Sequence, residues 1–113
     1  MIGKATLPDL FAGMNKTEKM WAISLEARKR RGEIHDWMYE RVTFKLGDDC
    51  RYTPDFFVIL LDGMIEIYET KGAFIREDAR VKLKAAATMF PFFRFVLAQY
   101  KKKVWTAWEI RRV

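Results

Sequence analysis

The residues of this chain best suited to chemistry lie in one stretch, PDFFVILLDGMIEIYETK, which carries charged groups near both of its ends. Asp55 enters a first hydrophobic run, and Glu69 with Lys71 closes a second. The runs meet at Asp62-Gly63, a strong signal for a two-residue β-hairpin turn. Asp55 and Glu69 are equally far from Asp62 along the sequence, so the hairpin would make their carboxylates cross-strand neighbours.

Alternation along the second run determines which side chains share a face of the sheet. Successive residues of a strand point to opposite sides. Glu69 and Lys71 therefore share a face with Ile65 and Ile67, whereas Glu66 points to the opposite face, toward solvent or toward a helix. The strand face that begins with two isoleucines ends with a carboxylate beside an ammonium group.

This combination of charges indicates a metal site. Two carboxylates at the end of a sheet repel each other unless a positive charge lies between them. Their oxygens suit a hard divalent cation, Mg²⁺ or Mn²⁺. Such a metal activates water and stabilises charge on a phosphoryl transition state. Lys71 would orient the attacking water and add positive charge at the phosphate. The pattern is that of a site that cleaves phosphodiester bonds.

Two helices and a set of strands must position this cluster. Asn15 and Glu18 form a capping-box pattern, which predicts a helix that ends near Arg31, before Gly32. Hydrophobic period and turn residues predict strands over residues 34–39, 42–46, 56–61 and 64–71, a helix over 78–90, and strands over 92–99 and 104–111. This order is typical of an α/β fold with a mixed central β-sheet flanked by helices. Residues 1–14 are expected to form an N-terminal arm and residues 15–113 a single domain.

Composition limits the class of protein. A chain of 113 residues makes one domain, and its single cysteine excludes an internal disulfide framework and a multi-cysteine zinc site. No apolar run approaches the roughly 18–20 residues that span a bilayer. The N-terminal segment lacks the apolar core of a secretory signal. These features favour a soluble, cytoplasmic protein with no membrane partner.

Positive charge gathers in several clusters. The 21 lysines and arginines exceed the 15 acids, and the net charge of +6 favours polyanionic partners, chiefly nucleic acid. Charge at the end of the first helix also suits its macrodipole, and surface solvation is the plain alternative elsewhere. The candidate DNA-binding residues are Arg28, Lys29, Arg31, Arg76, Arg80, Lys84, Lys101, Lys102 and Lys103.

The catalytic candidates have plain structural interpretations as well. Asp55 is an ordinary polar residue for the entry of a strand. Glu69 and Lys71 would form, if exposed, a charge pair worth about a few tenths of a kcal/mol. A capping box explains Glu18 without any metal. Only the hairpin, by bringing the acids together, favours the metal site.

Pro54-Asp55 followed at a distance by Glu69-Thr70-Lys71 resembles the signature of the PD-(D/E)XK nucleases, the restriction-endonuclease-like superfamily. The order of helix, antiparallel strands, helix and further strands is also similar to the core of that superfamily. The segments YTPDF and ETKG, and a basic, alanine-rich second helix, look like those of small phage-encoded nucleases. The resemblance implies a restriction-endonuclease-like core.

The resemblance also implies roles for individual residues. Asp55 and Glu69 would bind the metal, Mg²⁺ or Mn²⁺, and the backbone carbonyl of Thr70 would add a ligand. Lys71 would be the catalytic lysine. Many members, including Holliday-junction resolvases, carry a glutamate on the first helix where Glu18 lies, so Glu18 would complete or support the metal shell.

The resulting hypothesis is a divalent-metal-dependent DNA endonuclease. It would act on branched or duplex DNA, such as Holliday-junction-like intermediates, in phage recombination, replication or repair in the cytoplasm of a bacterial host. Paired cuts on two strands suit a two-fold homodimer, with the first helix, rich in exposed aromatics, and the N-terminal arm as candidate interfaces. Two alternatives stay open: a non-catalytic DNA-binding recombination accessory protein, and an exonuclease of the same fold.

Overall fold

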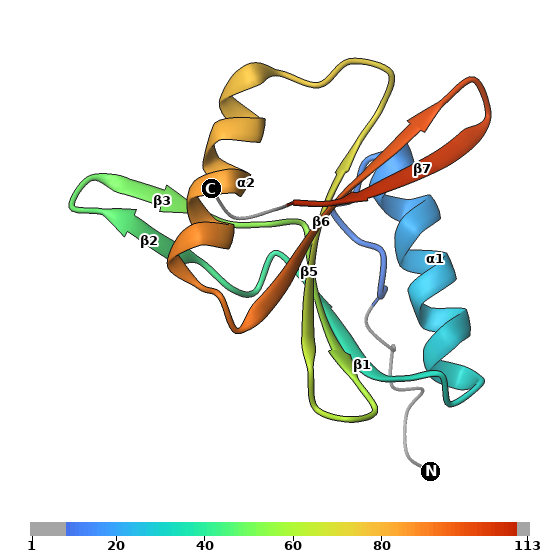
Figure 1. Ribbon diagram of the computed structural model, residues 1–113. Coiled ribbons are helices and arrows are strands. Elements are labelled where there is room, and N and C mark those ends of the chain that lie inside the picture. Colours follow the sequence, from blue (N-terminus) through green and yellow to red (C-terminus); the bar gives the residue numbers. More distant parts are fainter. Residues whose placement is uncertain (1–8, 111–113) are drawn as a thin grey trace, which may run out of the picture.

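The computed structural model describes residues 9–110, which form two helices and seven strands. In chain order the elements are α1 (Lys16–Arg30), β1 (Ile34–Tyr39), β2 (Phe44–Gly47), β3 (Cys50–Tyr52), β4 (Phe56–Leu60), β5 (Ile65–Lys71), α2 (Glu77–Met89), β6 (Phe93–Lys101) and β7 (Val104–Glu109). The helices lie on opposite sides of the main sheet (Figure 1). None of the described helices is long and apolar enough to cross a membrane.

The main sheet has five strands in the order β1-β4-β5-β6-β7. Neighbouring strands are antiparallel except β5 and β6, which are parallel and are connected through α2. A parallel pair needs a long crossover connection, and the helix supplies it. The predicted α/β class, with a mixed sheet flanked by helices, is confirmed.

Local signals explain where α1 begins and ends. Both hydrogen bonds of the capping box are present: Asn15 Oδ1 accepts from the Glu18 N–H at 2.8 Å, and Glu18 Oε1 accepts from the Asn15 N–H at 2.9 Å. Gly32 follows the helix with a φ of +75°, which glycine adopts without strain. The inner face of α1 buries Ala22 and Leu25 against the sheet.

The opposite face of the sheet is covered by α2 together with a separate two-stranded sheet, β2–β3. The sequence predicts one strand over 42–46 and a loop around Cys50, but the chain pairs Phe44 with Tyr52 across a short hairpin. Both aromatic rings are buried, against a core that includes Leu83 and Phe95. Three residues of strand give too short a pattern for periodicity to reveal, so β3 was missed.

The described part of the predicted arm packs on the domain. Phe11 stacks on Trp37, with ring centroids 6.4 Å apart, and Met14 packs against the same core cluster. Residues 1–8 of the arm lie outside the described residues. The first helix does not present an aromatic surface, because the Trp21 ring lies 5.2 Å from Tyr68 and 4.8 Å from Trp105. That expectation of an exposed aromatic interface on the helix is corrected.

Candidate functional site

Asp55 is fixed at the start of β4 by the end of β5. Its Oδ2 accepts hydrogen bonds from the Thr70 N–H at 2.7 Å and from the Thr70 hydroxyl at 2.8 Å. Its backbone carbonyl accepts from the Glu40 N–H at 2.9 Å. The residue is only 8% exposed. Among the described residues Oδ1 accepts no hydrogen bond, so this oxygen is left for a ligand.

Glu69 lies across the hairpin from Asp55. The last β4–β5 pair is Phe56 with Tyr68, and continuing that antiparallel register by one residue places Asp55 opposite Glu69. Glu69 is 6% exposed. The buried Tyr52 hydroxyl is near enough to lower the pKa of Glu69, although it makes no hydrogen bond of ordinary geometry with the described residues. The structure thus joins both halves of the sequence pattern at one end of the sheet.

Burial changes the acidity of both carboxyl groups. Burial raises the pKa of Asp55 to about 6, although its hydrogen bonds from Thr70 oppose the rise. Burial first, and the charge of Asp55 second, raise the pKa of Glu69 to about 8. The half-buried Lys71 lowers the pKa of both groups, but does not cancel the effect of burial. Near neutral pH Glu69 therefore retains a proton that a bound cation would displace.

A second acidic grouping meets the first at Asp55. One oxygen from each of Glu18, Glu40 and Asp55 lies within 4.8 Å of the others. Glu18 Oε1 accepts hydrogen bonds from the Asn15 N–H and from the Tyr39 hydroxyl, both at 2.9 Å. Glu18 therefore caps α1 and also faces Asp55, so its capping role does not exclude a role in the site.

Glu40 was not singled out from the sequence. It follows β1 with a φ of +48°, a left-handed conformation that is uncommon for residues other than glycine. Such strain persists only where surrounding contacts impose it, and it is frequent at functional sites. The β1–β4 register pairs Tyr39 with Phe56, so the next residues outward are Glu40 and Asp55. Only knowledge of that pairing could have revealed Glu40, because the sequence does not state which strand lies beside β4.

The donor set fits a hard divalent cation. Glu18, Glu40, Asp55 and Glu69 offer carboxylate oxygens only, which are the ligands that Mg²⁺ and Mn²⁺ prefer. The N–H of Thr70 points to the β4 side of β5, and both backbone groups of a strand residue point to the same neighbour. We therefore expect the Thr70 carbonyl on the Asp55 side as well. Glu69 is not part of the grouping defined by mutual distances below 4.8 Å.

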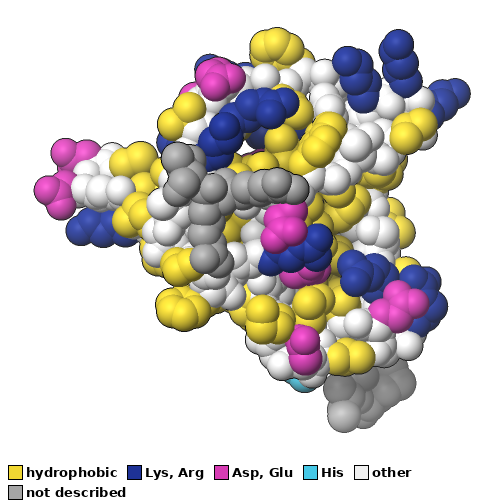
Figure 2. All heavy atoms as spheres, viewed as in Figure 1, with side chains coloured by type: hydrophobic (Ala, Val, Ile, Leu, Met, Phe, Trp, Pro, Cys, Tyr) yellow, Lys and Arg dark blue, Asp and Glu magenta, His cyan; other side chains and the backbone are white. Residues whose placement is uncertain are grey.

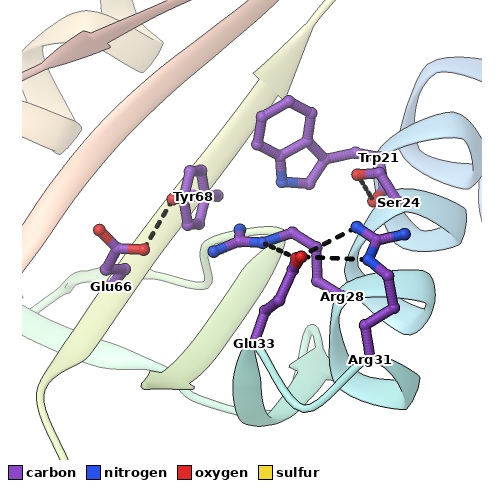
Figure 3. Close-up of polar contacts among 7 residues, drawn as sticks. All are labelled: Trp21, Ser24, Arg28, Arg31, Glu33, Glu66 and Tyr68. Carbon is purple, nitrogen blue, oxygen red and sulfur yellow. Dashed lines mark hydrogen bonds and ion pairs between the residues drawn. The ribbon is translucent and has the colours of Figure 1, made fainter. Parts of the chain in front are cut away.

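Glu66 faces away from this site. It is buried on the side of the sheet that α1 covers and accepts hydrogen bonds from the Tyr68 hydroxyl at 2.8 Å and from Arg94 at 2.6 Å. The close-up of this region shows the bond to Tyr68 (Figure 3). The sequence left open whether Glu66 faces solvent or a helix. In the structure Glu66 lies on the face that α1 covers.

Three basic candidates lie at the far end of α1 from Glu18. Ten residues separate Glu18 from Arg28, about 15 Å along a helix axis. Arg28 and Arg31 both approach Glu33 (Figure 3), at 3.8 Å and 3.1 Å. Lys29 lies 3.1 Å from Asp36. All three basic groups are therefore engaged in ion pairs with nearby acids. The structure does not bring these three residues to the acidic site.

The other basic candidates lie toward the site end of the sheet or along α2. Because β5 and β6 are parallel, Lys71 lies beside Gln99, and β6 continues past it to a turn of consecutive lysines. Lys/Arg side chains gather at this β6–β7 turn without acids among them (Figure 2). Arg76 forms an exposed ion pair with Asp78 at 3.4 Å. Exposed side chains without an ion pair to a described residue are Arg80, Lys84, Lys101, Lys102 and Lys103.

Comparisons with known proteins give one structural likeness. No family model matches the chain, and no curated protein matches it. The solved structure of SSO0001 aligns with a TM-score of 0.49 and 14% sequence identity. The alignment covers 83% of this chain and 50% of that one, so this chain spans about half of its length. A likeness at this level says nothing about activity.

Proposed function

We propose that this protein is a divalent-metal-dependent DNA endonuclease with the PD-(D/E)XK arrangement of residues. The observation that carries the proposal is the pair of hydrogen bonds from Thr70 to Asp55, at 2.7 Å and 2.8 Å. These bonds join the Pro-Asp half of the motif to the Glu-Thr-Lys half at one end of the sheet. A bare sequence match occurs by chance, whereas buried acids placed together have a cost that function would explain.

Each residue of the site has a separate role in this proposal, and its position is consistent with that role. Mg²⁺ or Mn²⁺, when bound, supplies an activated water and neutralises charge on the phosphate. Asp55 presents Oδ1 while Thr70 holds Oδ2, so the carboxylate cannot rotate away from the site. Glu69 supplies further negative charge from the opposite strand. Glu18 and Glu40 lie on the outer side of Asp55 and would complete or support the ligand shell.

Lys71 closes the site on the solvent side. It is the last residue of β5 and is half-buried, so its stem packs on the sheet while its ammonium group reaches the rim. From there it would donate hydrogen bonds to the attacking water or to a non-bridging phosphate oxygen. Its charge also lowers the pKa of both Asp55 and Glu69, which favours the ionised form that a metal requires.

The basic surface suits a nucleic-acid substrate read through its backbone. Lys101, Lys102 and Lys103 lie on the turn that extends beyond the rim, and Arg76 and Arg80 flank the start of α2. Phosphate contacts of this kind position a substrate without reading its sequence. Selection by DNA shape, including branched DNA, and a homodimer that makes paired cuts follow as parts of this proposal.

Cleavage of labelled DNA tests the proposal. Four-way junction, flap, linear duplex and single-stranded substrates are incubated with the protein and Mg²⁺ or Mn²⁺. We expect internal cuts, reduced at least about a hundredfold by Asp55→Asn and by Lys71→Met. Asp48→Asn is the matched control, because Asp48 is an exposed acid on the β2–β3 turn.

The same assay separates the alternatives. Binding without cleavage of any substrate with either metal would show the non-catalytic accessory protein. Release of mononucleotides from ends alone would show the exonuclease. Equal loss of activity in Asp48→Asn and Asp55→Asn would remove the assignment of the site.

A further inference from the structure

Phe74 is an exposed aromatic residue held next to the proposed site. It lies in the connection between β5 and α2, three positions after Lys71, and is 79% exposed. Three residues of extended chain span at most about 11 Å, which limits the distance between the Cα atoms of Phe74 and Lys71. That length is about three nucleotide steps along a strand at 3.4 Å each.

The backbone on both sides of Phe74 is anchored. The Gln99 side-chain amide donates to the carbonyls of Gly72 at 3.2 Å and Ala73 at 3.1 Å. On the other side, Ile75 packs against the core cluster under α2. The loop is therefore tied to the protein immediately before and after the exposed ring, so the ring is presented outward by a fixed support.

The surroundings of Phe74 favour a polyanion with flat apolar groups. Lys71 precedes it at the rim, and the exposed Arg80, which has no ion pair to a described residue, follows it on α2. The first turn of α2 also carries Glu77 and Asp78, and Asp78 pairs with Arg76 at 3.4 Å. A ring with cations on both sides along the chain matches single-stranded nucleic acid, in which charged phosphates alternate with bases that can stack. In a duplex the bases are already stacked and paired, so an exposed phenylalanine contacts a base face only by unstacking a base step, which costs a few kcal/mol.

We infer that Phe74 stacks on an unpaired base next to the phosphate held at the Asp55–Lys71 site. This inference rests on the proposed function and specifies its substrate: DNA with unpaired or easily opened bases beside the cleaved bond, as at a junction, flap or single strand. The stacked base fixes the register of the strand relative to Lys71. Contacts from the lysine turn remain independent of base pairing.

Binding without metal tests this role separately from catalysis. The probes are a single-stranded oligonucleotide that carries 2-aminopurine and the duplex of the same sequence, both in EDTA. Phe74→Ala should weaken single-strand binding about tenfold and abolish the quenching of 2-aminopurine, while duplex binding changes less than about twofold. Phe74→Trp should retain both signals. Phe92→Ala is the matched control, because Phe92 is 84% exposed and follows the other end of α2.

The outcomes distinguish this inference from the function on which it rests. If the wild-type protein binds neither probe, the proposed nuclease function fails and the inference fails with it. If the wild-type protein binds DNA but Phe74→Ala behaves as Phe92→Ala does, the stacking role is wrong and the nuclease proposal stands. If Phe74→Ala instead converts a dimer to a monomer in sedimentation, the ring serves self-association and the inference is overturned.

Discussion

At the scale of single residues, Asp55 and Glu69 are unusual because the protein buries two acids with little to neutralise them. Asp55 receives two hydrogen bonds from Thr70, yet burial still raises its pKa to about 6. The pKa of Glu69 reaches about 8, because the charge of Asp55 adds to the effect of burial. Lys71 is the cation that lowers both values. Such an arrangement lowers the stability of the fold, and the proposed cation would offset that cost.

The stability of the metal-free protein should therefore fall with rising pH. In the unfolded chain these acids lose their protons near pH 4, whereas in the fold they keep them to about 6 and about 8. The folded state binds more protons across this window, so the free energy of unfolding decreases as pH rises from about 4 to about 8. The loss should amount to several kcal/mol, since each pKa unit corresponds to about 1.4 kcal/mol. Thermal unfolding in EDTA between pH 5 and pH 8.5 measures it.

Glu69→Gln isolates this effect, because the amide keeps the shape of the side chain and does not titrate. We expect the variant to have a higher Tm than the wild-type protein at pH 8 in EDTA, and a smaller change of Tm with pH. Saturating Mn²⁺ should raise the Tm of the wild-type protein more than that of the variant. Asp48→Asn serves as the exposed control. A wild-type Tm that rises steadily from pH 5 to pH 8.5 in EDTA would contradict the raised pKa values of the two buried acids.

At the scale of elements, the sequence predicted what local signals determine. The capping box places the start of α1, and the Asp62-Gly63 turn places the β4–β5 hairpin, so the meeting of Asp55 with the end of β5 was accessible from spacing alone. Contacts between elements that are distant in the sequence could not be predicted from it. Glu40 joins the site only through the β1–β4 pairing, and Tyr52 reaches it only because β3 folds under α2.

The β6–β7 turn is an element whose sequence opposes its local conformation. Lys101 pairs with Val104, and the intervening Lys102 and Lys103 have φ values of +52° and +62°. Positive φ at both central residues is the type I′ turn, for which Asn-Gly is strongly preferred. Holding two lysines there costs about 1–2 kcal/mol per residue. The strain is consistent with selection of lysine for its charge at this position.

Replacing the turn should separate stability from binding. Lys102→Asn combined with Lys103→Gly should raise the free energy of unfolding by about 1–2 kcal/mol, measured by urea denaturation. Asn-Gly adopts the turn with less strain, and the greater freedom of glycine in the unfolded chain offsets part of the gain. The same variant should bind duplex DNA more weakly, because two phosphate contacts are lost. A double change to glutamine is the control that removes the charge and keeps the strain. If the Asn-Gly variant binds DNA as the wild-type protein does, the lysine turn is not a DNA contact.

At the scale of the whole molecule, basic charge is divided between two ends that differ in pairing. Near the end of α1, Arg28, Lys29 and Arg31 are matched by the acids Glu33 and Asp36. At the β6–β7 turn the three lysines have no acid beside them among the described residues, and they lie at the end of the sheet that carries Lys71. In Figure 2 the first region mixes dark blue with magenta and the second is dark blue alone. Of the net charge of +6, the part that would attract a polyanion most strongly therefore lies at the β6–β7 turn.

The salt dependence of DNA binding should reveal this division. Each phosphate that a protein neutralises adds about 0.9 to the slope of log K against log salt concentration. Changing Lys101, Lys102 and Lys103 together to glutamine should reduce the slope by about 2 to 3 in fluorescence anisotropy titrations with duplex DNA. The variant with Arg28, Lys29 and Arg31 changed to glutamine carries the same loss of charge, yet should change the slope by less than about 1, because those groups already pair with acids. Equal reductions in the two variants would mean that net charge, and not its placement beside the site, governs DNA binding.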